Sequence, residues 1–140
     1  MRTFPHFSWS WQVLNDQALL QYDVLGPAEE EEAVGFYDAM LTMVPGDIFL
    51  FIGNYGRQET SVSSSAMEGL VDRTLQRNIT RVRCCIVTRQ RSYAAKARLY
   101  EALCISRGLD GLMYSTRNQA AGRRWIEEQI SGENSGISAD

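Results

Sequence analysis

Residues 47–72, DIFLFIGNYGRQETSVSSSAMEGLVD, contain the transitions that decide the fold. Residues 48–52 form a short, continuous apolar run, which is typical of a strand covered on both faces. A glycine-punctuated loop and a serine cluster follow, and the apolar spacing beyond them predicts a helix over residues 66–77. A buried strand, a loop and a helix in this order indicate an α/β protein, in which such loops commonly bind ligands.

The segment before this stretch predicts a β-hairpin and a helix. Residues 8–14 and 18–25 alternate apolar and polar side chains, the pattern of half-buried strands. Pro27 suits the first turn of the helix that follows. Four glutamates at residues 29–32 complement the positive end of its dipole.

The aromatic side chains of the first strand leave alternatives open. The aromatic residues Phe4, Phe7, Trp9 and Trp11 form a dense patch at the start of the sequence. We expect them to pack in the core or, if the strand is a sheet edge, to contact a second copy of the chain or line an apolar cavity.

The segment after the stretch continues the alternation. Strands are predicted over residues 82–87 and 112–114, and helices over residues 93–106 and 118–130. Ser92 is expected to cap the first of these helices, and Thr116 with Gln119 forms a capping box for the second. The inward face of the helix at residues 93–106 is expected to carry Ala95, Leu99, Ala102 and Leu103.

The resulting order is β-β-α-β-α-β-α-β-α. It predicts an α/β domain over residues 1–130, with a sheet that is mostly parallel after the hairpin and covered by helices. Residues 131–140, SGENSGISAD, are polar and expected to form a disordered tail. No membrane span or signal peptide is evident, so we expect a cytoplasmic protein without integral membrane association.

The charge of the chain is divided unevenly along its length. Residues 1–50 contain one arginine and eight carboxylates, whereas residues 73–124 contain eleven arginines and Lys96 against two carboxylates. This division predicts a bipolar surface with an anionic partner for the basic part, because arginine suits bidentate contacts to phosphate or carboxylate. The alternative is that the arginines are scattered over solvated helix faces.

Candidate site residues follow the predicted strands. Loops after parallel strands meet at one carboxyl edge of the sheet, where ligands bind in open α/β folds. Serines at a helix start present N–H groups that favour anions. The predicted anion site contains Arg57, Ser63, Ser64, Arg89, Arg91 and Arg117. The alternatives are solvated loop arginines and simple helix capping, since Ser65 and Glu68 fit a capping box.

Catalysis and metal binding are not expected. His6 is the only histidine and has no evident partner carboxylate, and no G-x-S-x-G or H-E-x-x-H motif is present. Cys84, Cys85 and Cys104 lack C-x-x-C spacing and fit small core side chains. We expect no cofactor, and nucleic acid is not expected as a partner because no aromatic-basic RNA-binding motif occurs.

The element order, the strand at residues 48–52, the serine-led helix at 65–78 and the ending at 118–130 resemble the STAS domain over nearly the whole chain. That family includes anti-sigma-factor antagonists and relatives grouped with the CRAL-TRIO lipid-binding fold. In the antagonists a serine of a D-S-S-G-type motif is phosphorylated. The nearest match here is residues 63–67, SSSAM, which lacks the aspartate and the glycine and follows a longer loop, and Ser64 is the positional candidate.

The sequence therefore predicts a non-enzymatic, STAS-like regulatory or protein-binding domain with an anion site at the carboxyl edge. Its expected partner is another protein or a second copy of the chain. The alternative function is a carrier of a small lipid or amphiphile, as the CRAL-TRIO resemblance implies.

Overall fold

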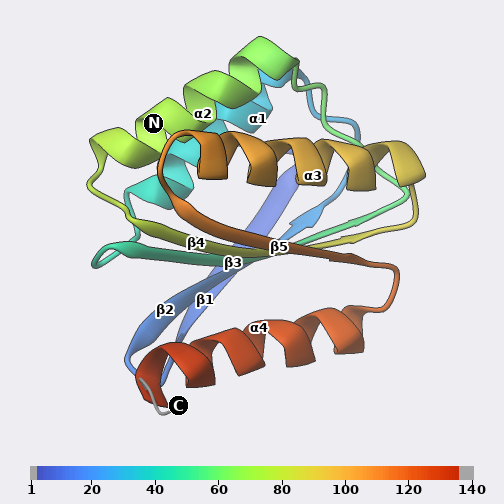
Figure 1. The fold of residues 1–140 in the computed structure, drawn as a ribbon. Helices are drawn as coiled ribbons and strands as arrows, with labels where there is room; N and C mark the ends of the chain where they lie inside the picture. Colours follow the sequence, from blue (N-terminus) through green and yellow to red (C-terminus); the bar gives the residue numbers. More distant parts are fainter. Residues whose placement is uncertain (1–2, 136–140) are drawn as a thin grey trace.

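A computed structural model describes residues 3–135 of the protein and shows five strands alternating with four helices in the predicted order (Figure 1). The strands are β1 (Phe7–Leu14), β2 (Gln17–Val24), β3 (Ile48–Gly56), β4 (Arg81–Thr88) and β5 (Asp110–Thr116). The helices are α1 (Glu30–Leu41), α2 (Ser64–Gln76), α3 (Arg91–Ser106) and α4 (Gln119–Ser135).

The strands form one sheet in the order β1-β2-β3-β4-β5, so every strand lies beside its neighbour in sequence. β1 and β2 are antiparallel and are joined by Asn15 and Asp16, whose φ angles of 51° and 65° fit a two-residue hairpin turn. The other three pairings are parallel. The prediction of an α/β fold with a mostly parallel sheet after an N-terminal hairpin is confirmed.

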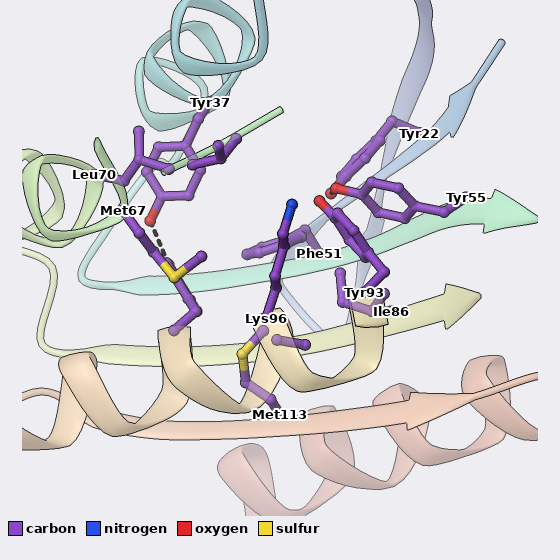
Figure 2. A pocket seen from close by; sticks show the side chains of 13 residues that line it. Tyr22, Tyr37, Phe51, Tyr55, Met67, Leu70, Ile86, Tyr93, Lys96 and Met113 are labelled. Carbon is purple, nitrogen blue, oxygen red and sulfur yellow. Dashed lines mark hydrogen bonds between the residues drawn. The ribbon is translucent and has the colours of Figure 1, made fainter. Parts of the chain in front are cut away.

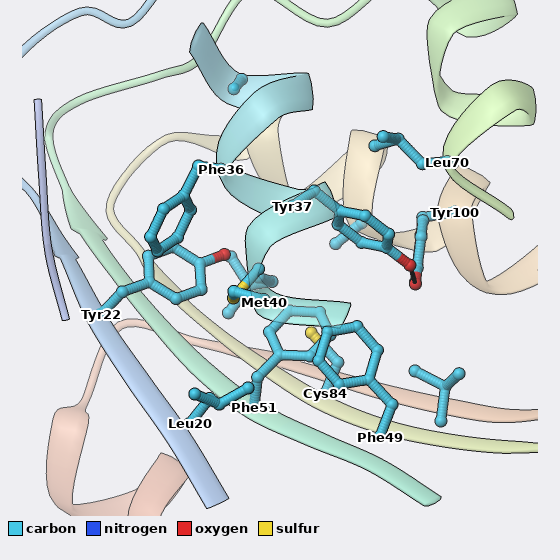
Figure 3. Packing of buried hydrophobic residues seen from close by; sticks show 14 of the residues in the cluster. Leu20, Tyr22, Phe36, Tyr37, Met40, Phe49, Phe51, Leu70, Cys84 and Tyr100 are labelled. Atoms are coloured by element: carbon cyan, nitrogen blue, oxygen red, sulfur yellow. Dashed lines mark hydrogen bonds between the residues drawn. The ribbon is translucent and has the colours of Figure 1, made fainter. Parts of the chain in front are cut away.

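Helices cover both faces of the sheet. In Figure 1, α1, α2 and α3 lie on one face and α4 lies alone on the other. The larger core lies under the three helices, where Phe36 of α1 packs against Tyr22 of β2 and Tyr37 of α1 packs against Phe49 of β3 (Figure 3). The smaller core lies under α4 and consists of Leu19, Leu50, Ile52, Cys85, Val87, Ile126 and Ile130. The three cysteines are buried, as expected.

Helix α2 shows how local sequence signals position the elements. The 3.6-residue period predicts an inward face of Met67, Leu70, Val71, Thr74 and Leu75, and the first four are buried whereas Leu75 is 36% exposed. Asn78 follows the helix with a φ of 62°, the left-handed conformation that asparagine tolerates.

The inward face of α3 differs from the prediction. Tyr93, Ala97, Tyr100 and Cys104 are buried. Of the predicted residues, Ala95, Leu99 and Ala102 are exposed, and Leu103 is partly buried against the core. Both sets recur at helical spacing. The set with the tyrosines is the buried one because their hydroxyl groups find hydrogen-bond partners in the interior.

Several boundaries also differ. β3 continues through the expected loop to Gly56, and Tyr55 is buried. Helix α4 extends to Ser135, so residues 131–135 are helical rather than part of a disordered tail. The rest of that expected tail, residues 136–140, lies outside the described residues. Among the described helices, none combines the length and apolar character needed to cross a membrane.

The N-terminal aromatic residues divide into two groups. Phe4 and Phe7 pack against Phe36 of α1, with centroid distances of 5.6 Å and 4.3 Å. Trp9 and Trp11 are 46% and 54% exposed instead. Core packing is therefore wrong for the two tryptophans, because β1 is an edge strand that extends beyond the cover of α1.

Candidate functional site

Three of the predicted arginines surround one depression at the carboxyl edge of the sheet. Arg89 and Arg91 follow β4, and Arg117 follows β5. β4 and β5 are parallel neighbours paired as far as Val87 and Thr116, so their following loops leave the sheet side by side. The depression measures about 290 Å³ and is also lined by Thr88, Gln90, Ala94, Ser115 and Thr116.

The start of α3 lies in this depression and has no side-chain cap. Gln90 occupies the N-cap position, but its side chain donates a hydrogen bond to the Arg57 carbonyl oxygen at 3.1 Å. Ser92, the expected cap, is inside the first turn and donates to the Glu59 carboxylate at 3.3 Å. The main-chain N–H groups of the first turn are therefore open to an acceptor from outside the helix.

The charge of the depression is not neutralised from within. Five other arginines of the basic half form ion pairs with carboxylates. Arg73 pairs with Asp38, Arg81 and Arg83 with Asp110, Arg107 with Asp72, and Arg123 with Glu127. In the part of the chain that the structure describes, no such ion pair involves Arg89, Arg91 or Arg117. Among the described residues Arg77, Arg98 and Arg124 also take part in none of these ion pairs, so what sets the three arginines at this edge apart is that they line one depression.

Arg57 contributes to the loop mainly through its backbone. Its carbonyl oxygen binds Gln90, and the neighbouring Gly56 carbonyl accepts the Arg89 N–H at 2.7 Å. The Arg57 side chain is exposed and does not line the depression. The structure therefore links Arg57 to the depression without placing its guanidinium there.

The start of α2, the other part of the predicted site, is already occupied. The Ser63 hydroxyl accepts the Ala66 N–H at 3.1 Å, and the Glu30 carboxylate accepts the Ser63 N–H at 2.7 Å. Ser63 is therefore the cap, and the expected capping by Ser65 is wrong. The hydrogen bond from Ser63 lowers the pKa of Glu30, so a carboxylate of the chain itself occupies this helix start.

This occupancy separates the serines from the arginines. Ser63 is not free, and Ser64 lies exposed in the first helical turn. Neither serine lines the arginine depression. Phosphorylation of Ser64 stays a prediction, and a phosphate there would share a helix start with the Glu30 carboxylate.

The starts of α4 and α1 also show contacts that local sequence did not indicate. Asn118, not Thr116, caps α4 by accepting the Ala121 N–H at 3.0 Å, while the Thr116 hydroxyl accepts the Asn118 N–H. His6 has a carboxylate partner after all, since its Nδ1 lies 2.6 Å from Glu32 Oε1. This pair ties the segment before β1 to α1.

Tyrosines surround a small, partly open cavity under α1, α2 and α3 (Figure 2). Its volume is about 80 Å³. The Tyr22 and Tyr55 hydroxyls are 2.7 Å apart, and Tyr93 binds Thr60 at 2.8 Å. Lys96 extends from α3 into this group, where its Nζ donates to the Thr60 carbonyl oxygen at 3.3 Å.

A second cluster of hydroxyl-bearing side chains lies in the same layer. Tyr37 binds both Thr74 and Tyr100. Sequence reasoning missed these tyrosines and Lys96. The only local signal was their helical spacing on α3, at Tyr93, Lys96 and Tyr100.

Burial keeps the interior groups protonated. It raises the pKa of Tyr22, Tyr55 and Tyr100 well above the ordinary phenol value. It also raises the pKa of Cys85 to about 12 and that of Cys104 to about 11. None of these groups is an activated nucleophile at neutral pH. The described residues hold no cluster of three or more metal-ligating side chains.

Comparison with known proteins supports the fold alone. No protein-family model matches the chain, and no curated protein matches it. A similar solved structure is that of an uncharacterized protein of the DUF3478 family with a SpoIIAA-like fold, from Shewanella loihica PV-4. The TM-score is 0.56 at 11% identity, over 86% of this chain and 93% of that one. The chain therefore has the SpoIIAA-like, STAS-type fold that its sequence predicted.

Proposed function

We propose that this chain is a non-enzymatic binding domain of a regulatory kind, which recognises an anionic group on a protein partner. The proposed site is the depression lined by Arg89, Arg91 and Arg117. The observation that carries the proposal is the combination of these three arginines with the uncapped start of α3.

The site has the physical features of anion recognition. Main-chain N–H groups and the helix dipole favour negative charge at a helix start, and guanidinium groups form charge-assisted hydrogen bonds to carboxylate or phosphate. The hydroxyls of Ser115 and Thr116, also in the lining, offer further donors. Because the depression is open, it suits a charged group presented on a larger surface.

The size of the interior favours a partner-binding domain over a lipid carrier. The tyrosine-lined cavity of about 80 Å³ is well below the roughly 300–1,000 Å³ of typical small-molecule pockets. A carrier would need α1–α3 to separate from the sheet. Native mass spectrometry of the purified protein tests this alternative, and a co-purifying amphiphile would favour the carrier.

Binding of inorganic phosphate and of an otherwise uncharged phosphopeptide tests the proposed site. We expect both to shift the amide NMR signals of residues 89–92 and 115–117. The double variant R89Q/R91Q should weaken phosphopeptide binding at least about tenfold, since each charge-assisted hydrogen bond contributes about 1.5–3 kcal/mol.

The matched control is R98Q, which removes an exposed arginine from the same helix outside the depression. Equal binding by R89Q/R91Q and R98Q would contradict the proposal. Binding of the phosphopeptide without binding of free phosphate would show that the peptide surface contributes, as a protein partner requires.

A further inference from the structure

The outer edge of β1 is open to another strand. β2 is its neighbour on one side, and among the described residues no strand pairs with its other side. Leu14 and Gln17 flank the two-residue turn and so form a hydrogen-bonded pair. Because such pairs alternate in an antiparallel ladder, Ser8, Ser10 and Gln12 also bond to β2. The main-chain groups of Phe7, Trp9, Trp11 and Val13 therefore face outward, although the Phe7 N–H already donates to the Phe4 carbonyl oxygen at 3.0 Å.

Three of these outward-facing residues also carry exposed apolar side chains. Trp9, Trp11 and Val13 lie on one face of β1, and Val13 is 60% exposed. The strand sequence FSWSWQVL contains no charge and no proline. Charged residues and prolines ordinarily protect an edge strand from pairing, so β1, which has neither, is an unprotected edge.

We propose that β1 is the interface between two copies of this chain, which pair antiparallel and join their sheets into one. A two-fold axis perpendicular to the sheet keeps the tryptophans of both copies on the same face. An uncharged strand meets its own copy without like-charge repulsion. A second copy also brings the outward-facing N–H and C=O groups of its own β1 opposite those of the first copy.

The alternation restricts the register, because outward-facing residues are odd-numbered and each must pair with an odd-numbered residue of the second copy. Pairing the tryptophans of the two copies with one another selects the register that has Ser10 at the two-fold axis, Trp9 opposite Trp11, and Phe7 opposite Val13. At this last pair, Phe7 contributes its carbonyl oxygen alone. Trp9 and Trp11 of the two copies then form cross-strand aromatic pairs.

The area is sufficient for a specific dimer. Each half-exposed tryptophan adds on the order of 100 Å². Together with Val13 and the paired backbones, the two copies bury roughly 1,000 Å², the size at which specific interfaces begin.

Sedimentation velocity over a concentration series tests the interface and its register. The wild-type chain should change from a monomer of 15.8 kDa to twice that mass as concentration rises through the micromolar range. W9K/W11K should stay monomeric, because lysines then face lysines. W9K/W11E should again dimerise, because the register places each lysine opposite a glutamate. L112K is the matched control, since Leu112 is 43% exposed on the opposite edge strand, β5.

A wild-type chain that stays monomeric would overturn the proposal, as would a dimer that survives W9K/W11K. If W9K/W11E is monomeric while the wild type dimerises, the proposed register is wrong. Circular dichroism and thermal unfolding of each variant establish that it is folded, as expected for exposed positions.

Discussion

The starts of α2 and α3 are two solutions to the same physical problem. Each helix presents main-chain N–H groups that no turn of the helix can satisfy. At α2, the Ser63 hydroxyl and the Glu30 carboxylate supply the acceptors. At α3, no side chain caps the helix, and Arg89 and Arg91 adjoin its start. One helix start is closed by the chain itself, and the other is left open to an anion.

The difference shows why a serine cluster was a misleading signal. Serines at a helix start are preferred caps, so their presence indicates that the N–H groups are already satisfied. An absent cap beside unpaired arginines is the better indicator of a ligand site. Substitutions at the open start of α3 should therefore change ligand binding most, whereas substitutions at the closed start of α2 should mainly change the stability of the fold.

Closing the start of α3 should have the largest effect. Gln90→Asp places a carboxylate at the N-cap position, where α2 has the hydroxyl of Ser63. We expect phosphopeptide affinity to fall at least about tenfold, because the new charge competes for the N–H groups and the arginines, while the fold gains about 0.5–2 kcal/mol. Calorimetric titration and urea unfolding measure the two effects. Gln90→Asn is the control, since it caps without adding charge, and equal affinities of the two variants would contradict the electrostatic role.

Opening the start of α2 should have a smaller effect. Ser63→Ala removes the hydroxyl that accepts the Ala66 N–H, so the free energy of unfolding should fall by about 1 kcal/mol. Urea unfolding measures this change. Ser64→Ala and Ser92→Ala, which remove exposed hydroxyls inside first turns, should each cost less than about 0.5 kcal/mol. Similar losses in all three variants would show that Ser63 is not the cap.

The smallest effect concerns acid. The folded state lowers the pKa of Glu30, so its carboxylate stabilises the fold above the ordinary value of 4.5, and that contribution disappears as pH falls through the lowered value. In Glu30→Gln, the melting temperature should therefore decline less steeply on acidification below about pH 4.5. Thermal unfolding across this range, with Glu31→Gln as the control, measures the difference. Identical acid profiles of Glu30→Gln and the wild type would rule out this role.

Sequence patterns predicted the elements that depend on local signals. The order of elements along the chain, most of the inward face of α2 and the left-handed residue Asn78 at its end follow from periodicity and backbone preference within a few residues. The cap at Ser63 could not be predicted, because three adjacent serines are locally equivalent and the choice depends on Glu30, 33 positions away. Arg89, Arg91 and Arg117 were predicted to converge because the carboxyl ends of parallel strands share an edge.

The interior and the edge depend on the whole topology. The face of α3 was predicted from its leucines and alanines, yet Tyr93 and Tyr100 are buried, with their hydroxyls hydrogen-bonded to those of Thr60 and Tyr37. Trp9 and Trp11 have the alternation of a core-facing strand. Only the position of β1 at the end of the sheet leaves them exposed.

The strand order described above also has a consequence for synthesis on the ribosome. Because each strand pairs with the one made just before it, the sheet can grow in step with translation, without waiting for a distant segment. The exception is the face under α4, the last helix to emerge. Until α4 packs on this face, Leu19, Leu50 and the other strand residues of the smaller core stay uncovered. The nascent chain is therefore most exposed to aggregation, and to chaperones, just before its final helix docks.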